Sequence, residues 1–592
     1  MREFMEDAIR RGGGLLYRGN LGGSAFASPG ENEFISDQVL PSKIRHFRLL
    51  QRMKLPLASL ALTLLSALPL AGQEAVQTDL VIYGGTSAGV VAAVQAAKMG
   101  RSVALIEPSQ HFGGMSVEGL GGSDIDNHKP FQNSPAVGGL TLQFYRKAAR
   151  RYGKLAEFDE MLKTREKKPA LWRFESHVAE EVFSTWMKEF PKIRLFPGTR
   201  LADAGGAVKE GPRLVALKAE GGQEFRGRMF IDATYEGDLL AAAGVSTTVG
   251  REGNAKYGET LNGIRANTTY NQFSVKLDPY KTPGDPSSGL IACIQDGVVG
   301  EHGAGDKSIQ AYCFRLCFTK DPANRIPFAK PDGYNPDEYE IYRRYLKAGG
   351  KLWKPGPALP NGKTDLGSWH DLSGNMIGWN HDWPTATHAR RQELFKHSLT
   401  FIQGLCWFSA NDPSVPEDVR QAWSQWGVCK DEFQDHGGWP RMFYVRNGRR
   451  MISDFVLTEA HGRKENQVAV DDSVALVWWP FDLHNARRIV KDGAAWNEGT
   501  VFGGDKWAPF GVSYRSVVPK AAECVNLLTP TCPSSSYVAY GAIRLEWTFM
   551  VMGQSVATAA VLAMDSGVPV QQLDYQKLKL RLEKDAQVLD VP

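Results

Sequence analysis

The sequence predicts an α/β fold organised around a parallel β-sheet. Residues 80–83 form an apolar run rich in β-branched side chains, which is typical of a buried parallel strand. A glycine-rich turn follows at once, and residues 90–99 are rich in alanine and favour a helix. Residues 102–106 then form a second apolar strand. This order of elements defines a β-turn-α-β unit, around which the rest of the chain is organised.

The turn of this unit has the composition of a dinucleotide-binding site. Its residues are Gly84, Gly85, Thr86, Ser87, Ala88 and Gly89. Gly84 permits the tight turn, Gly89 lets the helix pack closely, and the helix N-terminus offers N–H groups to a pyrophosphate. Glu107 ends the second strand, 23 residues after Gly84, where a carboxylate can accept both hydroxyl protons of a ribose. Thr86 replaces the usual middle glycine and predicts a tighter approach to the pyrophosphate.

Gly113 and Gly114 follow Glu107 closely, where a chain turning back over a dinucleotide needs to pass near it. With this pair, residues 79–115 resemble the FAD-dependent oxidoreductases whose nucleotide domain is shared with fumarate reductase-type and glutathione reductase-type flavoproteins. The resemblance implies FAD as cofactor and a Rossmann-like FAD-binding domain, a parallel sheet plus a β-meander. It also implies an inserted mixed α+β substrate-capping domain, and Met115 and Leu201 as further cofactor contacts. Members of this family are sometimes labelled xanthan lyase-like.

The resemblance extends to about residue 565 and divides the chain into segments. We expect an upstream extension at 1–52, a signal peptide at 53–73, two parts of the FAD-binding domain at 76–254 and 441–570, a cap at 255–440 and a tail helix at 571–592. Three β-rich segments, 193–201, 213–219 and 224–231, predict the meander returning to the sheet. The turn that follows, 232–238, matches the family, which implies that Ala233, Thr234 and Gly237 lie near the dinucleotide. A plain strand-to-helix turn is the alternative.

Composition excludes some classes of function. The chain has 592 residues, 43% of them apolar, which suffices for two or more domains. The net charge of +4 includes no basic run dense enough for nucleic acid, so we expect no nucleic-acid partner. The seven cysteines show no metal-binding spacing, so no metal is predicted. Cys524 and Cys532 are the nearest plausible disulfide pair, and buried reduced thiols are the alternative.

The N-terminal region predicts export. Met53 and Lys54 precede an apolar run that ends in small residues near Ala71, which is typical of a secretory signal peptide. Its short length, with Pro56 and Pro69, predicts no stable membrane span. The mature protein is then expected to begin close to Glu74, in the periplasm or secreted. Residues 1–52 are either an upstream, disordered extension or a cytoplasmic extension before a signal anchor.

The expected cap is poor in regular periodicity and rich in tryptophan and tyrosine. Helices are predicted at 387–408 and 416–425. Aromatic faces suit a polyhydroxylated substrate, although Trp369, Trp379, Trp383 and Trp407 are equally compatible with a core role. The loop formed by Asn380, His381 and Asp382 faces the active site or is a turn held by its aspartate.

Four residues are candidates for catalysis. His484, oriented by Asp482, has the pKa range of a general base and lies in an aromatic-Asp-x-His stretch that resembles the family. Arg515 and Arg544 are anchors for a substrate carboxylate or an oxyanion, or ion-pair partners of Glu523 and Glu546. Tyr537 stands where the family pattern has a histidine, so the resemblance implies that it removes or replaces an acid–base group at this position.

Near the C-terminus, Gly553, Gln554 and Ser555 resemble the family's closing motif. We expect them to begin an alanine-rich helix whose N-terminus faces the flavin and stabilises the charge of its reduced form.

Together these features predict an exported FAD-dependent oxidoreductase. It would transfer hydride from a small polar substrate, sugar-like or a hydroxy acid, to flavin, with an unknown electron acceptor. A polysaccharide-processing lyase or a carbohydrate-binding protein with structural FAD is the alternative.

Overall fold

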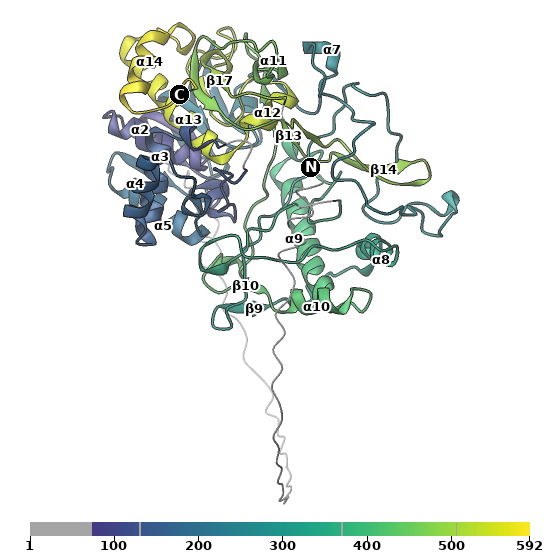
Figure 1. Ribbon diagram of the computed structural model, residues 1–592. Coiled ribbons are helices and arrows are strands. Elements are labelled where there is room, and N and C mark those ends of the chain that lie inside the picture. The colour runs from purple at the N-terminus through teal and green to yellow at the C-terminus, as the bar shows by residue number, and fades with distance from the viewer. Residues whose placement is uncertain (1–73, 129–131, 369–370, 505, 592) are drawn as a thin grey trace, which may run out of the picture. The chain divides into compact units, whose positions relative to one another are not determined.

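The structure is a computed structural model that describes residues 74–128, 132–368, 371–504 and 506–591 (Figure 1). The predicted extension at 1–52, the predicted signal peptide at 53–73 and Trp369 lie outside the described residues.

The predicted parallel sheet is present and has seven strands, in the order β3-β2-β1-β6-β5-β4, with β18 also beside β6. The strands are β1 Val76–Tyr83, β2 Val103–Ile106, β3 Ile193–Phe196, β4 Ala207–Glu210, β5 Arg213–Lys218, β6 Glu224–Asp232 and β18 Leu527–Leu528. β1 runs parallel to β2 and to β6, and it brings Tyr83 beside Ile106 and Asp232. The carboxyl ends of the three central strands therefore meet at one edge, where ligands bind in sheets of this kind.

The meander is shorter than predicted. Of the segment 193–201, only β3 is a strand, and it pairs in parallel with β2 instead of joining the meander. β4, β5 and the first half of β6 form the antiparallel part. The second half of β6 pairs with β18, so a strand from the C-terminal region completes the sheet.

Helix α2, Ser87–Lys98, packs against α13, Glu546–Ser566, although the two are far apart in sequence (Figure 1). Gln95 Nε2 donates to Thr558 Oγ1 at 3.0 Å across this contact. Among the described residues, α13 is the one helix long and apolar enough to cross a membrane, and 94% of its most apolar window is buried in the protein. It is therefore a core helix that packs against α2 and β6.

The predicted helix start at Gly553, Gln554 and Ser555 is wrong, because α13 begins seven residues earlier, at Glu546. Residues 546–552 contain no proline or glycine, so nothing in them stops the helix from extending. Gly553 is tolerated inside the helix for a packing reason. A Cβ at this position would lie 2.3 Å from the Ala88 carbonyl oxygen, so glycine lets α13 approach α2.

The cap contains α8 Glu340–Lys347, α9 His388–Asn411 and α10 Glu417–Ser424, with a small antiparallel sheet of β8 Phe318–Thr319, β9 Arg325–Pro327 and β10 Gly427–Cys429. The two helices predicted in this region are confirmed as α9 and α10. The hairpin of β14 Arg487–Lys491 and β15 Ala494–Glu498 also joins it, because Ala495 N donates to the Leu277 carbonyl at 2.9 Å. The predicted cap is therefore completed by a segment from the predicted range 441–570.

The first turn of α9 is anchored to the sheet. Arg391 donates through Nη1 and Nη2 to both oxygens of Asp238, at 2.6 and 2.8 Å. Asp238 begins α6, directly after β6, and also accepts from Arg449 Nη1 at 2.8 Å. This ion-pair network fixes the cap helix over the carboxyl ends of the strands.

The remaining elements connect these parts. They are α3 Gly139–Arg151, α4 Leu155–Thr164, α5 Ser176–Lys188, α6 Asp238–Ala242, β7 Thr247–Thr248, α7 Asn254–Tyr257, β11 Arg450–Met451, α11 Glu459–Gly462, β12 Ser473–Val477, β13 Asp482–Leu483, β16 Val501–Phe502, β17 Phe510–Ser513, α12 Tyr537–Ile543 and α14 Tyr575–Lys584. α14 lies within the predicted tail at 571–592.

Candidate functional site

The glycine-rich turn closes tightly between β1 and α2. Gly84 has φ +103°, and a Cβ there would lie 2.5 Å from the Thr234 amide nitrogen, so only glycine fits. Thr86 is the N-cap of α2. Its Oγ1 accepts from Gly89 N at 3.2 Å and donates to the Ala233 carbonyl at 2.7 Å. Thr86 thus fixes the turn to the end of β6, a role that the sequence pattern did not reveal.

The first-turn amides of α2, at Ser87 and Ala88, precede the first hydrogen bond that the helix can make with itself. Such a terminus, with its positive dipole end, suits a phosphate group.

Glu107 lines a cavity of about 350 Å³ over the carboxyl ends of β1 and β2. Its carboxylate accepts from Gly85 N at 2.7 Å and from Ser109 N at 2.8 Å, one bond to each oxygen. Burial raises the pKa of Glu107. The opposite wall comes from the cap and includes Trp383 and Phe395. The carboxylate therefore stands, already oriented, in a cavity between sheet and cap.

Gly113 and Gly114 continue from Glu107 with left-handed backbone angles, φ +131° and +54°. A Cβ on Gly114 would lie 2.2 Å from the Tyr235 hydroxyl oxygen. That hydroxyl accepts from Met115 N at 2.9 Å and donates to Glu546 Oε1 at 2.5 Å. The predicted pair thus permits a close backbone crossing beside the glycine-rich turn.

Glu546, at the N-terminus of α13, completes this contact. Ser87 Oγ donates to its Oε1 at 2.6 Å, and burial raises the pKa of Glu546 to about 7. Two helix N-termini, those of α2 and α13, therefore meet at one carboxyl group. The positive dipole end that was predicted at Gly553 lies here instead.

Of the other residues predicted to contact the cofactor, one lines the cavity, and two have structural contacts near it. Thr234 lines the cavity, and Gly237 caps α6 in the left-handed conformation. Leu201 N donates to Tyr83 Oη, and the Leu201 carbonyl oxygen lies 3.0 Å from His388 Nε2. Both of its backbone groups therefore bond within the protein.

Gln554 and Ser555 are buried inside α13. Gln554 Oε1 accepts from Leu140 N at 2.7 Å, and Ser555 Oγ donates to the Val474 carbonyl at 2.6 Å. The structure gives both side chains packing partners in neighbouring elements.

His484 lies directly after β13 and is half-buried, with 17% of its side chain exposed. Its Nδ1 is 3.3 Å from Ser368 Oγ, its Nε2 is 4.0 Å from Asp482 Oδ1, and its backbone N donates to Gln310 Oε1. Burial, followed by the positive charges of Arg446, Arg544 and Arg315, lowers its pKa well below the ordinary value. The imidazole is therefore neutral at physiological pH.

Arg544 shares these surroundings. Its Nη1 donates to Tyr444 Oη at 2.9 Å, and its Nη2 donates to the carbonyl and Oδ2 of Asp482 at 2.9 and 3.2 Å. The expected ion pair with Glu546 is wrong. Glu546 begins the next helix and receives its hydrogen bonds from Ser87 and Tyr235 instead.

Arg515 lies outside the group of residues around His484. Half of its side chain is exposed, and it forms ion pairs with Asp471 at 2.7 Å and Asp472 at 2.9 Å. The expected partner Glu523 instead accepts from Ser246 N and Oγ. The structure brings Arg544, but not Arg515, to His484.

Tyr537 is the first residue of α12. Its backbone N donates to Glu252 Oε2 at 2.9 Å, and its ring lies 5.7 Å from the Arg450 guanidinium carbon. Among the described residues its hydroxyl has no hydrogen-bond partner, and burial raises its pKa. The contacts of Tyr537 link it to the 250–252 and 450 segments and not to His484.

Three of the groups around His484 were not predicted from the sequence: Ser368, Tyr444 and Arg446. Arg446 opens the arginine-rich run 446–450, and that run was the one available signal. Nothing in the local pattern around Ser368 or Tyr444 distinguishes them from other polar loop residues.

The Asn380 loop has a structural role. Asp382 Oδ2 accepts from Arg390 Nε at 2.9 Å, and Asn380 Oδ1 accepts from Tyr312 N at 3.3 Å. His381 Nδ1 accepts from Ile309 N, and burial lowers the pKa of this histidine to about 4.

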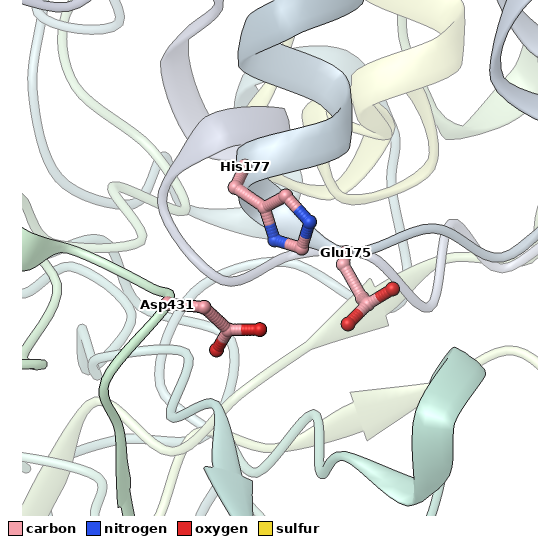
Figure 2. Close-up of side chains that lie close together, drawn as sticks. All are labelled: Glu175, His177 and Asp431. Carbon is pink, nitrogen blue, oxygen red and sulfur yellow. The ribbon is translucent and has the colours of Figure 1, made fainter. Parts of the chain in front are cut away.

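Figure 2 shows three potential metal ligands, Glu175, His177 and Asp431, close together. The buried ammonium group of Lys363 lies among them. Its Nζ is 2.7 Å from Glu175 Oε1, 2.8 Å from Asp431 Oδ2 and 2.8 Å from Glu432 Oε1. His177 Nδ1 also pairs with Glu432 at 2.8 Å. The carboxylates thus have a cation from the chain itself, and we assign the cluster to joining α5 with the cap.

All seven cysteines are free thiols. Cys524 Sγ lies 3.7 Å from Asn526 Oδ1, and Cys532 Sγ lies 3.5 Å from the Thr234 carbonyl oxygen. Of the two alternatives that the sequence left open, the structure has the buried thiols.

The nucleotide site fits FAD. The turn is closed by glycines that admit no Cβ, the α2 terminus suits a pyrophosphate, and Glu107 presents a carboxylate for a ribose. Fold and site together define a dinucleotide-binding flavoprotein.

A comparison with protein families makes the class specific. The model of the family described as FAD dependent oxidoreductase matches residues 79–582, so the chain belongs to that family. FAD is accordingly its cofactor. No curated protein matches the chain.

Several solved structures are similar to part of the chain. They include L-proline dehydrogenase from P. horikoshii (16% identity, TM-score 0.21), the GidA-related protein from Thermus thermophilus (18%, 0.16) and L-amino acid deaminase from Proteus vulgaris (16%, 0.20). The matches cover 30%, 26% and 28% of this chain and 59%, 52% and 55% of those chains. The chain thus spans little more than half the length of these three structures.

Proposed function

We propose that the protein is an exported dehydrogenase that removes a hydride and a proton from a carbinol group of a small polar substrate, a sugar or a hydroxy acid. The observation that carries this proposal is the half-buried imidazole of His484, which lies between Ser368 Oγ and Asp482 and near three guanidinium groups. FAD, when bound, supplies the two-electron acceptor. The protein must then supply a base for the hydroxyl proton and groups that hold the substrate.

His484 meets the requirements of this base. When Nδ1 donates to Ser368 Oγ, Nε2 carries a lone pair that can accept the substrate proton. Burial keeps the ring in its neutral, accepting form. Asp482, 4.0 Å from Nε2, stabilises the imidazolium that forms.

Arg544 supports the same step. It is 3% exposed, and its Nε–H has no hydrogen-bond partner among the described residues. A donor of this kind stabilises negative charge on the substrate oxygen as the proton leaves.

A spectroscopic experiment tests the reaction. The purified protein should show the absorbance band of oxidised flavin at about 450 nm. A panel of sugars and hydroxy acids, added without oxygen, should include compounds that bleach the band. A protein whose bound flavin no member of the panel bleaches would contradict the dehydrogenase and favour the lyase or carbohydrate-binding alternative. A protein without the band would contradict both.

Export is tested separately. Sequencing the N-terminus of the protein recovered outside the cytoplasm should find a start close to Glu74. A mature chain that retains residues 53–73 would contradict export through a cleaved signal.

A further inference from the structure

Arg446 is a buried cation with neutral partners. It is 1% exposed. Its Nη1 donates to the Ala311 carbonyl and to Asn375 Oδ1, and its Nη2 donates to Ser368 Oγ at 2.6 Å and Cys313 Sγ at 3.2 Å. In the described part of the chain it forms no ion pair, and its Nε–H has no partner. A buried charge without a counter-charge is costly, so Arg446 favours an anionic ligand.

Arg544 lies close to Arg446, with one aromatic ring shared between them. The guanidinium carbons lie 5.1 Å (Arg446) and 5.8 Å (Arg544) from the centroid of the Tyr444 ring. The Nε–H of Arg544 is also buried and unpartnered. Ser368 Oγ joins the pair to the base, because it contacts both Arg446 Nη2 and His484 Nδ1. Two free guanidinium N–H groups therefore belong to the surroundings of His484.

The carboxylates of the same cluster are committed to other partners. Asp482 accepts from Arg544 at 3.2 Å. Asp365 accepts from Arg315 Nε at 2.7 Å and from Gly122 N at 2.9 Å. Asp124 accepts from Asn127 Nδ2 at 2.7 Å, and burial raises its pKa, which disfavours its charged form. None of the three neutralises Arg446.

Two side-chain amides add further donors. Gln310 Nε2 and Asn447 Nδ2 are buried and lack partners among the described residues. Their orientation is fixed by backbone donors, because Gln310 Oε1 accepts from His484 N and Asn447 Oδ1 accepts from Gln310 N. The network thus offers donors to a ligand that is rich in acceptor atoms.

We propose that Arg446 binds a carboxylate of the substrate, while the Nε–H of Arg544 stays with the reacting oxygen, so that the enzyme selects hydroxy acids or sugar acids over neutral sugars. This inference rests on the proposed dehydrogenase function and assigns its substrate class. A guanidinium binds a carboxylate through charge-assisted hydrogen bonds, which explains why arginine occupies the position.

The test compares acids with their neutral counterparts on the FAD-loaded enzyme. D-gluconate, D-glucuronate and L-lactate are titrated against D-glucose and methyl lactate, with the flavin spectrum reporting binding. Acids should bind about 10- to 100-fold more tightly than the matched neutral compounds. They should also raise the melting temperature of the wild type in proportion to the logarithm of their concentration. Equal affinity for acids and neutral compounds overturns the inference.

Arg446→Met should lower the affinity for acids about 10- to 100-fold more than the affinity for neutral compounds, while Arg446→Lys should restore part of the affinity for acids. Arg515→Met, which removes an arginine outside the cluster, should keep the full preference. Measuring the flavin midpoint potential of the variant distinguishes a role of Arg446 in substrate binding from a role toward the cofactor. If Arg446→Met shifts the potential and leaves the acid preference intact, Arg446 serves the flavin and the inference is overturned.

The two proposals fail in different ways. Neutral sugars that bleach the flavin as well as acids do would leave the dehydrogenase standing without the carboxylate subsite. Acids that bind tightly through Arg446 but bleach nothing would leave the subsite standing without the dehydrogenase.

Discussion

Glu107 and Glu546 are both buried carboxyl groups beside the glycine-rich turn, and the structure uses them differently. Glu107 has both oxygens held by backbone amides and faces the cavity, so it stays in position for a ribose. Glu546 accepts from two hydroxyl groups through one oxygen, and its other oxygen has no partner among the described residues. The first was predicted from its place at the end of β2. The second was expected to pair with Arg544.

His484→Ala should slow flavin bleaching by about 10²- to 10⁴-fold without loss of bound FAD, because the base is removed and the nucleotide site is untouched. Since burial holds its pKa well below 6.5, the wild-type rate should stay flat from about pH 8 down to pH 6.5. Stopped-flow reduction at several pH values measures both effects.

His381→Gln is a matched control, because His381 is another histidine that burial keeps neutral, with a pKa of about 4. A variant at position 484 that bleaches at the wild-type rate would refute the assignment of the base.

At the scale of elements, the contact between α2 and α13 joins the two parts of the FAD-binding domain. α2 carries the predicted pyrophosphate terminus, and α13 presents Glu546 to it. Gly553 sets the distance between the helices, because its missing Cβ leaves room for the Ala88 backbone. The position of the turn therefore depends on a residue more than 460 positions away.

Gly553→Ala should destabilise the protein by about 1–3 kcal/mol, because its Cβ would lie 2.3 Å from the Ala88 carbonyl oxygen. Helix propensity alone predicts the opposite sign, a gain of about 1 kcal/mol. Urea unfolding distinguishes the two, and a stabilised variant would show that α13 does not approach α2 so closely. FAD affinity should fall as well, since the N-terminus of α2 must shift.

At the scale of the whole molecule, several buried carboxyl groups carry raised pKa values in the folded state. Burial raises the pKa of Glu118 and Glu546 to about 7 and that of Asp232 to about 6. A raised pKa means that the folded protein binds the proton more tightly than the unfolded chain does. The stability that each group contributes is fully present at a pH below the pKa of the group in the unfolded chain. It is lost as the pH rises through the pKa of the group in the folded protein.

For Glu546, stability should therefore fall between pH 4.5, the ordinary value, and pH 7, by up to about 3 kcal/mol. Glu546→Gln should flatten this dependence, because the amide keeps the acceptor oxygen and cannot ionise. The quantity to measure is the difference in unfolding free energy between wild type and variant at pH 5 and pH 8.

Taking this difference cancels the ion-paired carboxylates, such as Asp306, whose lowered pKa gives the opposite trend. A difference that is independent of pH would contradict the raised pKa of Glu546.

The sequence alone determined the nucleotide site. The glycine-rich turn and Glu107 lie within 79–115, and the local pattern of strand, turn, helix and acid follows from propensity and periodicity, as β1, α2 and β2 confirm. The same short-range signals located α9 and α10 within a few residues. They were misleading at Gly553, where glycine was interpreted as a helix start.

Only the tertiary structure decided what surrounds His484. Ser368, Tyr444, Arg446 and Arg544 come from separate segments of the chain, and no local pattern records which of them meet. The same holds for the partners of Glu546 and Arg515. The physical reason is that strand and helix signals are short-range, whereas the pairing of buried charges is settled by which segments pack together.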